Sequence, residues 1–122
     1  MTTAFWCVLI AGLLPYAATL TAKAGAPRFD NANPRDWLAN QSGYRRRANA
    51  AQLNGFEAFP LFAAAVIIAH LKGAPQPRVD MLAMVFVAAR IAHLGLYLAD
   101  RSTLRSLAWF AGIGSAVAIF LA

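Results

Sequence analysis

Charged side chains are scarce in this chain. Only 13% of its 122 residues are Asp, Glu, Lys or Arg, whereas 60% are hydrophobic. A soluble domain of this length buries only about two-thirds of the surface of its chain, so it cannot hide that much apolar surface. The composition therefore excludes an ordinary soluble domain and indicates a membrane protein. The length allows one domain at most, which we assign to residues 1–122.

Cysteine and histidine are nearly absent as well. The single cysteine, Cys7, excludes an internal disulfide framework, and its apolar neighbours favour a packing role for it. The only two histidines, His70 and His93, are far apart and do not make a zinc site with one cysteine, so we predict no metal. The chain also has neither a glycine-rich phosphate loop nor a nucleophile elbow.

Acidic residues are outnumbered by basic ones, and the formal net charge is +6. Such a charge can attract nucleic acid. Here, however, the Lys and Arg residues sit between apolar segments and form no basic stripe with interleaved aromatic residues. We therefore expect no nucleic-acid partner. Basic residues between apolar segments are typical of the signals that orient membrane proteins.

What the chain does contain is apolar segments, each close to the roughly 20 residues that cross a bilayer. They run over about residues 3–22, 48–71, 79–99 and 104–122. The sequence thus predicts an all-α membrane protein, a bundle of four transmembrane helices. Met1-Thr2-Thr3 is uncharged, so we expect the first segment to be a retained span rather than a secretory signal. Residues 33–38 predict a turn leading into a short interfacial helix.

The basic residues are distributed unevenly among the connections. The second connection holds only Lys72 and Arg78, whereas the first and third, with their flanks, hold the following set: Lys23, Arg28, Arg35, Arg45, Arg46, Arg47, Arg101 and Arg105. The positive-inside rule then places the first and third connections in the cytoplasm and both termini on the other side. We predict an integral multi-pass membrane protein, in a bacterium one of the cell inner membrane, with membrane lipids as partners.

The second apolar segment begins with an unusual run of polar residues. Arg47, Gln52, Asn54 and Glu57 all lie within eleven residues. An ionisable group inside a membrane helix costs roughly 2.5–3.5 kcal/mol on insertion scales, so a chain that keeps one there pairs it or uses it. Helical geometry puts Arg47, Asn54 and Glu57 on one face and points Gln52 elsewhere.

The third segment carries a second polar face. Arg90, His93 and Tyr97 follow i, i+3, i+7 spacing, and Arg105 opens the fourth segment at the same predicted side of the membrane. In a purely structural interpretation Glu57 pairs with Arg90 inside the bundle. That pairing and a binding site are compatible. The tryptophans, Trp109 among them, are interpreted as interface or packing residues.

This set of side chains suits a small zwitterionic ligand that carries carboxylates. Arginine can grip a carboxylate through two hydrogen bonds. Glu57 can accept from an ammonium group, and an arginine at a helix start can stabilise a thiolate.

Two motifs now point to a known family. Residues 52–62, with Gln52, Asn54, Glu57 and a Phe-Pro-Leu-Phe ending, resemble the second-helix signature of the MAPEG family, the membrane-associated proteins in eicosanoid and glutathione metabolism. Residues 90–98, which contain Arg90, His93 and Tyr97, followed by Arg105, are similar to the third and fourth helices of microsomal prostaglandin E synthase in that family. The resemblance covers nearly the whole chain and fits a divergent, bacterial-type member.

The resemblance implies a homotrimer of four-helix subunits whose active sites lie between subunits and open toward the cytosol. It implies glutathione as co-substrate and a lipophilic small molecule as substrate. Carried over by position, Arg105 would stabilise the thiolate as the catalytic residue. The residues that would bind glutathione are Arg47, Gln52, Asn54, Glu57, Arg90, His93 and Tyr97.

Two functions follow as hypotheses. The first is a glutathione-dependent membrane transferase or peroxidase that acts on lipophilic electrophiles. The second is a non-catalytic scaffold or lipid-binding protein of the same shape. This second reading is favoured by Ala50, which stands where well-studied members of the family have an arginine, while the arginine here sits one turn earlier as Arg47.

Overall fold

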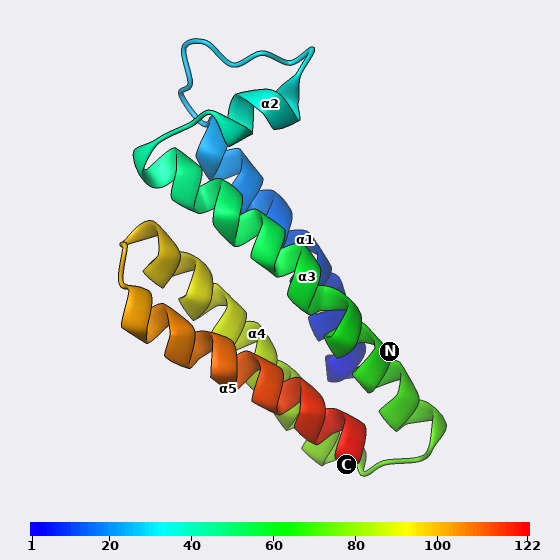
Figure 1. Cartoon of the computed structure of the whole chain (residues 1–122). Helices are drawn as coiled ribbons and strands as arrows, with labels where there is room; N and C mark the ends of the chain where they lie inside the picture. The colour runs from blue at the N-terminus through cyan, green and yellow to red at the C-terminus, as the bar shows by residue number, and fades with distance from the viewer.

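The computed structural model describes residues 1–122 and is entirely helical (Figure 1). Its helices are α1 (Thr3–Lys23), α2 (Pro34–Ala39), α3 (Gly43–Leu71), α4 (Gln76–Leu98) and α5 (Ser102–Leu121). All except the short α2 are long and apolar enough to cross a membrane. This confirms the predicted all-α class and the four predicted spans, and the chain is an integral multi-pass membrane protein.

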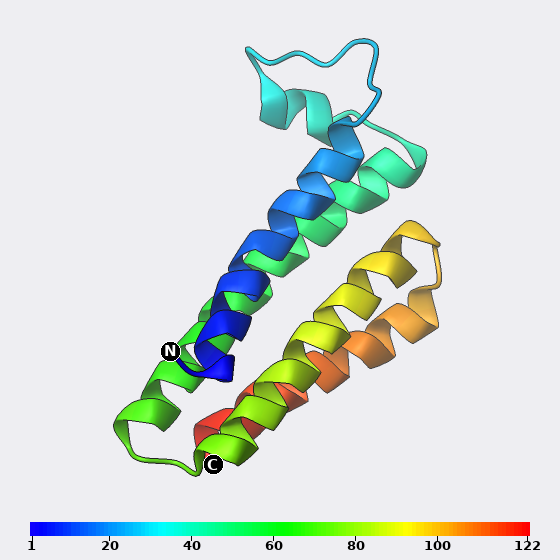
Figure 2. The ribbon, with the colours of Figure 1, turned by 180° about the vertical axis from the view of Figure 1, so that it is seen from behind.

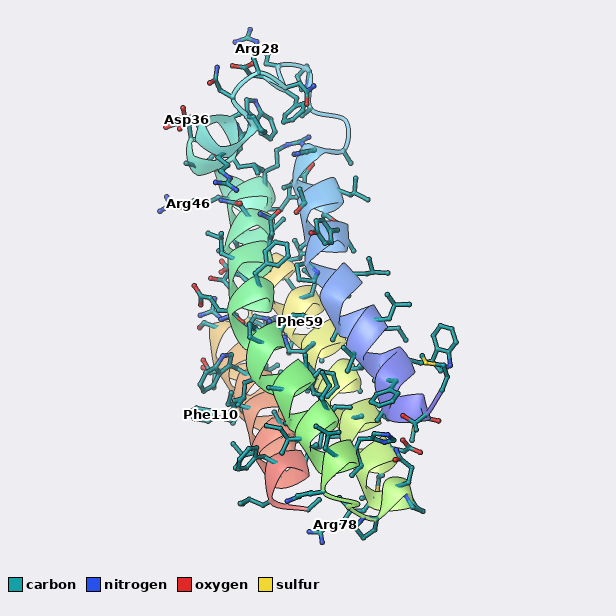
Figure 3. The ribbon with its side chains drawn as sticks, turned by 90° about the vertical axis from the view of Figure 1, so that its right-hand side faces the viewer. Arg28, Asp36, Arg46, Phe59, Arg78 and Phe110 are labelled. Atoms are coloured by element: carbon teal, nitrogen blue, oxygen red, sulfur yellow. The ribbon has the colours of Figure 1, made fainter.

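The four long helices form two adjacent pairs. α1 lies along α3, and α4 lies along α5, as Figures 1 and 2 show from opposite sides. The two termini and the α3–α4 connection lie at one end, whereas α2 and the α4–α5 turn lie at the other. Figure 3 shows Arg28 and Arg46 at the α2 end and Arg78 at the opposite end. This arrangement agrees with the predicted grouping of the basic connections. Which end faces the cytoplasm stays a prediction.

Close packing of small residues holds the core together. Alanine is the commonest buried residue, and it allows helix backbones to approach in an environment where lipid tails give no hydrophobic drive for association. The rings of Phe62 and Phe86 stack at 3.9 Å between α3 and α4. At the α1–α3 contact, Gly55 lies so close to Pro15 that an added Cβ would come within 2.8 Å of the proline ring.

The helix boundaries differ from the apolar segments mainly at the start of α3. The segment was predicted from about Ala48, but α3 begins at Gly43 and includes Arg45, Arg46 and Arg47. Hydropathy marks the part of a helix that crosses lipid, whereas arginine is a good helix former and extends the helix beyond it. The short helix α2 (Pro34–Ala39) lies close to the predicted 33–38, and Pro34 occupies its favoured first position.

Several helix ends are capped by side chains from other helices. The last carbonyls of a helix lack partners within that helix and carry partial negative charge, so they attract cations. Arg45 donates to the carbonyl of Ala22 at the end of α1, at 2.8 Å. Lys72 donates to that of Phe120 at the end of α5, at 2.7 Å. At the opposite polarity, Asp80 of α4 accepts from the backbone N–H of Ala4 in the first turn of α1. Charged residues at the ends of the spans thus tie the bundle together.

Arg47 is a further cap of a helix C-terminus, and its loss should lower the stability of the protein. Its Nε and Nη2 both donate to the carbonyl of Leu98, the last residue of α4, at 3.3 and 3.1 Å. Because the cation satisfies an otherwise unpaired carbonyl, Arg47→Ala should destabilise the protein by about 1–2 kcal/mol. Thermal unfolding in detergent measures this. Arg46→Ala is the matched control, since Arg46 is exposed and points away from the helices (Figure 3). Equal melting temperatures for the two variants would contradict the capping role.

Candidate functional site

A hollow of about 250 Å³ opens on the face formed by α3, α4 and α5. It gathers four of the residues singled out from the sequence, which come from all three helices: Asn54, His93, Tyr97 and Arg105. Ser106, Trp109 and Phe110 complete its wall on α5. No residue of α1 lines it.

Arg105 is positioned at this hollow by an aromatic stack. Its guanidinium carbon lies 4.2 Å from the centre of the Tyr97 ring, a cation–π distance. The Tyr97 ring in turn meets His93 edge to face at 5.5 Å. The Arg105 side chain donates no hydrogen bond within the chain, so its N–H groups remain free to meet a ligand in the hollow.

Arg90 is not at the surface of this hollow. The side chain is only 6% exposed, and its Nη2 donates to Oδ1 of Asn54 at 2.8 Å. The proposed pairing of Arg90 with Glu57 is therefore wrong: the guanidinium meets the neighbouring amide of α3 instead. Arg90 borders a different, mainly apolar cavity between α1, α3 and α4, so it stands behind Asn54 as seen from the hollow.

Glu57 lies in a second hollow that adjoins the first. This hollow is lined by Asn54, Glu57, Ala58, Trp109 and Ile113, and it shares Asn54 and Trp109 with the first. Glu57 is exposed, and it is the central residue of α3 (Gly43–Leu71). A carboxylate at that depth of a membrane span is costly unless a partner meets it. No cation of this chain does so.

Arg47 and Gln52 are not brought into either hollow. Arg47 is held by the carbonyl of Leu98. Oε1 of Gln52 is buried and has no hydrogen-bond partner within the chain. The sequence placed Arg47 on the same helical face as Asn54 and Glu57, but the side chain turns to the end of α4. The assignment of Arg47 and Gln52 to glutathione binding stays a prediction.

Trp109 was missed as a site residue. It was interpreted as an interface or packing aromatic, yet it borders both hollows and stands between them. The sequence spacing indicates this position, because Trp109 follows Arg105 by four residues and therefore lies on the same face of α5. The neighbouring Phe110 also lines the first hollow and is 63% exposed, and it lies at the outer edge of the bundle in Figure 3.

A model described as the MAPEG family matches residues 3–122. The chain belongs to the MAPEG family. That family includes glutathione transferases and peroxidases as well as non-catalytic members. No curated protein matches the chain.

In this MAPEG site, the cationic donor Arg105 lines the first hollow and the carboxylate of Glu57 lines the second. Arg105 can only donate. Ser106 Oγ donates its proton to the carbonyl of Ser102 at 3.1 Å, so it offers only lone pairs to the hollow. Glu57 when ionised can only accept. An anionic group therefore fits near Arg105 and a cationic group fits near Glu57, which is the polarity of a zwitterionic ligand.

Proposed function

We propose that this MAPEG protein is a glutathione-dependent membrane transferase or peroxidase that acts on lipophilic electrophiles. The observation that carries the proposal is the free guanidinium of Arg105, fixed over Tyr97 at the mouth of a polar hollow. A fixed cation stabilises the thiolate of bound glutathione electrostatically and raises the fraction of the reactive nucleophile. Asn54, His93 and Tyr97 line the space that the thiol peptide would occupy, and Glu57 receives its ammonium group.

The route of the electrophile is part of the same proposal. The hollow lies on the outer face of α3, α4 and α5, where Phe110 is exposed to the surroundings of the chain. A lipophilic molecule dissolved in the bilayer can reach that face without crossing water. The uncovered carboxylate of Glu57 is consistent with an assembly in which a neighbouring subunit meets it, and we propose a homotrimer. The basic residues at the α2 end support a cytoplasmic location for that end.

One observation favours the second candidate, a non-catalytic scaffold or lipid-binding protein. Ala50 has no side chain that could grip a carboxylate, and Arg47 does not replace the missing arginine because it caps α4. A principal anchor for the glutathione carboxylate is therefore absent from this subunit. Under this candidate the polar groups only hold the bundle together.

Titration of the purified, detergent-solubilised protein with glutathione near neutral pH tests the proposal directly. Ultraviolet difference absorbance reports the thiolate. The transferase proposal expects a saturable thiolate signal. A folded and oligomeric protein that gives no signal would contradict it and would favour the non-catalytic candidate.

Glu57→Gln separates the two candidates. If Glu57 receives the ammonium group of glutathione, removing its charge should raise the dissociation constant about tenfold while the assembly stays intact. Asp100→Asn is the matched control, because Asp100 lies in the α4–α5 turn away from both hollows. Size-exclusion chromatography monitors the assembly. A loss of assembly without any change in thiol binding would instead support the non-catalytic candidate.

A further inference from the structure

We propose that Arg90 is a positioning residue that works through Asn54, turning the amide so that its nitrogen faces the ligand and creating a subsite for an acceptor oxygen. The identity of the ligand as a thiol peptide rests on the proposed function. The orientation of the amide rests on the geometry of this chain alone.

The contact has only one chemically possible orientation. A guanidinium carries donors and no acceptor, so the group of Asn54 that meets Arg90 at 2.8 Å must be the carbonyl oxygen. The amide nitrogen then lies on the other branch of the side chain. Asn54 lines both hollows, whereas Arg90 lines neither. Arg90 therefore occupies one lone pair of the Asn54 oxygen and leaves both N–H donors of the amide nitrogen free for the ligand.

Arg90 packs between Asn54 on α3 and Gly112 on α5. A Cβ built at Gly112 would lie 3.6 Å from Cδ of Arg90 and 3.7 Å from Cβ of Ala89, which are ordinary contact distances, so Gly112 of α5 faces the aliphatic part of the Arg90 side chain. Arg90 itself is only 6% exposed. One buried side chain thus connects α3, α4 and α5 at the level of the site. A group held by packing and a hydrogen bond is oriented before the ligand arrives, which lowers the entropic cost of binding.

The chemical consequence is a wall that offers donors. Asn54, whose amide nitrogen has two free N–H donors, and Arg105, whose guanidinium has no acceptor, both line the first hollow. These donors select a peptide carbonyl or carboxylate oxygen of the thiol peptide that lies between Asn54 and Arg105. Reversing the amide would offer an oxygen to the same ligand atom and leave two acceptors facing each other.

Asn54→Asp is the decisive variant. Aspartate keeps an oxygen for Arg90, so the contact and the fold should persist, with a melting temperature at or above that of the wild type. It replaces the free N–H donors with an acceptor, however. We expect the dissociation constant for glutathione to rise at least tenfold. Binding within about twofold of the wild type would overturn the proposed donor subsite.

A double-mutant cycle tests whether Arg90 works through Asn54. Arg90→Met and Asn54→Ala should each raise KM for glutathione more than they lower kcat, and the double variant should be no worse than Asn54→Ala alone. Arg90→Lys keeps a donor and should restore part of the affinity. Additive losses of affinity would overturn the proposal, as would an Arg90→Lys variant no better than Arg90→Met.

The same double-mutant cycle can be measured by thermal unfolding, which requires no thiol. If Arg90 and Asn54 are coupled, the melting temperature of the double variant should lie close to that of the less stable single variant. Additive decreases in melting temperature would contradict the contact between Arg90 and Asn54. Failure of the wild-type protein to bind glutathione would count against the proposed function. The unfolding cycle still decides, in that case, whether Arg90 fixes Asn54.

Discussion

Arg105→Ala should lower glutathione-dependent turnover by about 10²–10³-fold while changing the dissociation constant for glutathione only about threefold. The guanidinium makes no hydrogen bond to the protein, so its removal costs the fold its cation–π contact with Tyr97, about 0.5–1 kcal/mol, and the bundle should persist. A preorganised charge matters most where negative charge is concentrated, which in thiol chemistry is the sulfur of the thiolate and not the peptide backbone. The expected loss therefore falls on kcat and on the thiolate absorbance.

Arg101→Ala is the matched control for this experiment. Arg101 is also an arginine at the start of α5, but it is exposed and borders a separate surface hollow formed by residues 100–104. The Arg101→Ala variant should keep both turnover and the thiolate signal within about twofold of the wild type. Equal changes in Arg105→Ala and Arg101→Ala, whether large or small, would show that the role given to Arg105 is wrong.

Much of this architecture could be predicted because it depends on local sequence. Length and hydropathy locate spans without knowledge of their neighbours, since a bilayer sets the required length. Helical periodicity is equally local. It placed Asn54 and Glu57 on one face of α3, and His93 and Tyr97 on one face of α4, and the hollows contain these pairs.

Contacts between segments that are distant in the chain could not be predicted in this way. Arg47 turns to the carbonyl of Leu98, 51 positions away, and nothing in the sequence around Arg47 indicates where α4 ends. The pairing of Glu57 with Arg90 was inferred from opposite charge, but the depth and rotation of α4 bring Arg90 to Asn54 instead. Asn54 and Glu57 are neighbours on one face of α3, and opposite charge alone does not determine which of them Arg90 contacts.

Gly55→Leu should be among the most destabilising single substitutions in this protein. A Cβ at position 55 would lie 2.8 Å from Cγ and 3.3 Å from Cβ of Pro15. The proline ring cannot rotate out of the way, so α1 and α3 must move apart. Overpacking of this kind costs about 3 kcal/mol, and Gly55→Ala should cost less because only one carbon is added and alanine favours helix. Unfolding in detergent, monitored by circular dichroism, measures both variants.

Gly114→Ala provides the control, since a Cβ at position 114 meets nothing within 4 Å. There the gain in helix propensity, about 1 kcal/mol at most, should make the variant as stable as the wild type or more stable. A Gly55→Leu variant as stable as Gly114→Ala would contradict the close α1–α3 contact. Because α1 lines neither of the two hollows, the fraction of Gly55→Ala that remains folded should bind glutathione as the wild type does. Stability and ligand binding are therefore separable in this bundle: the α1 side of α3 holds the helices together, and the α5 side presents Asn54 and Glu57 to the ligand.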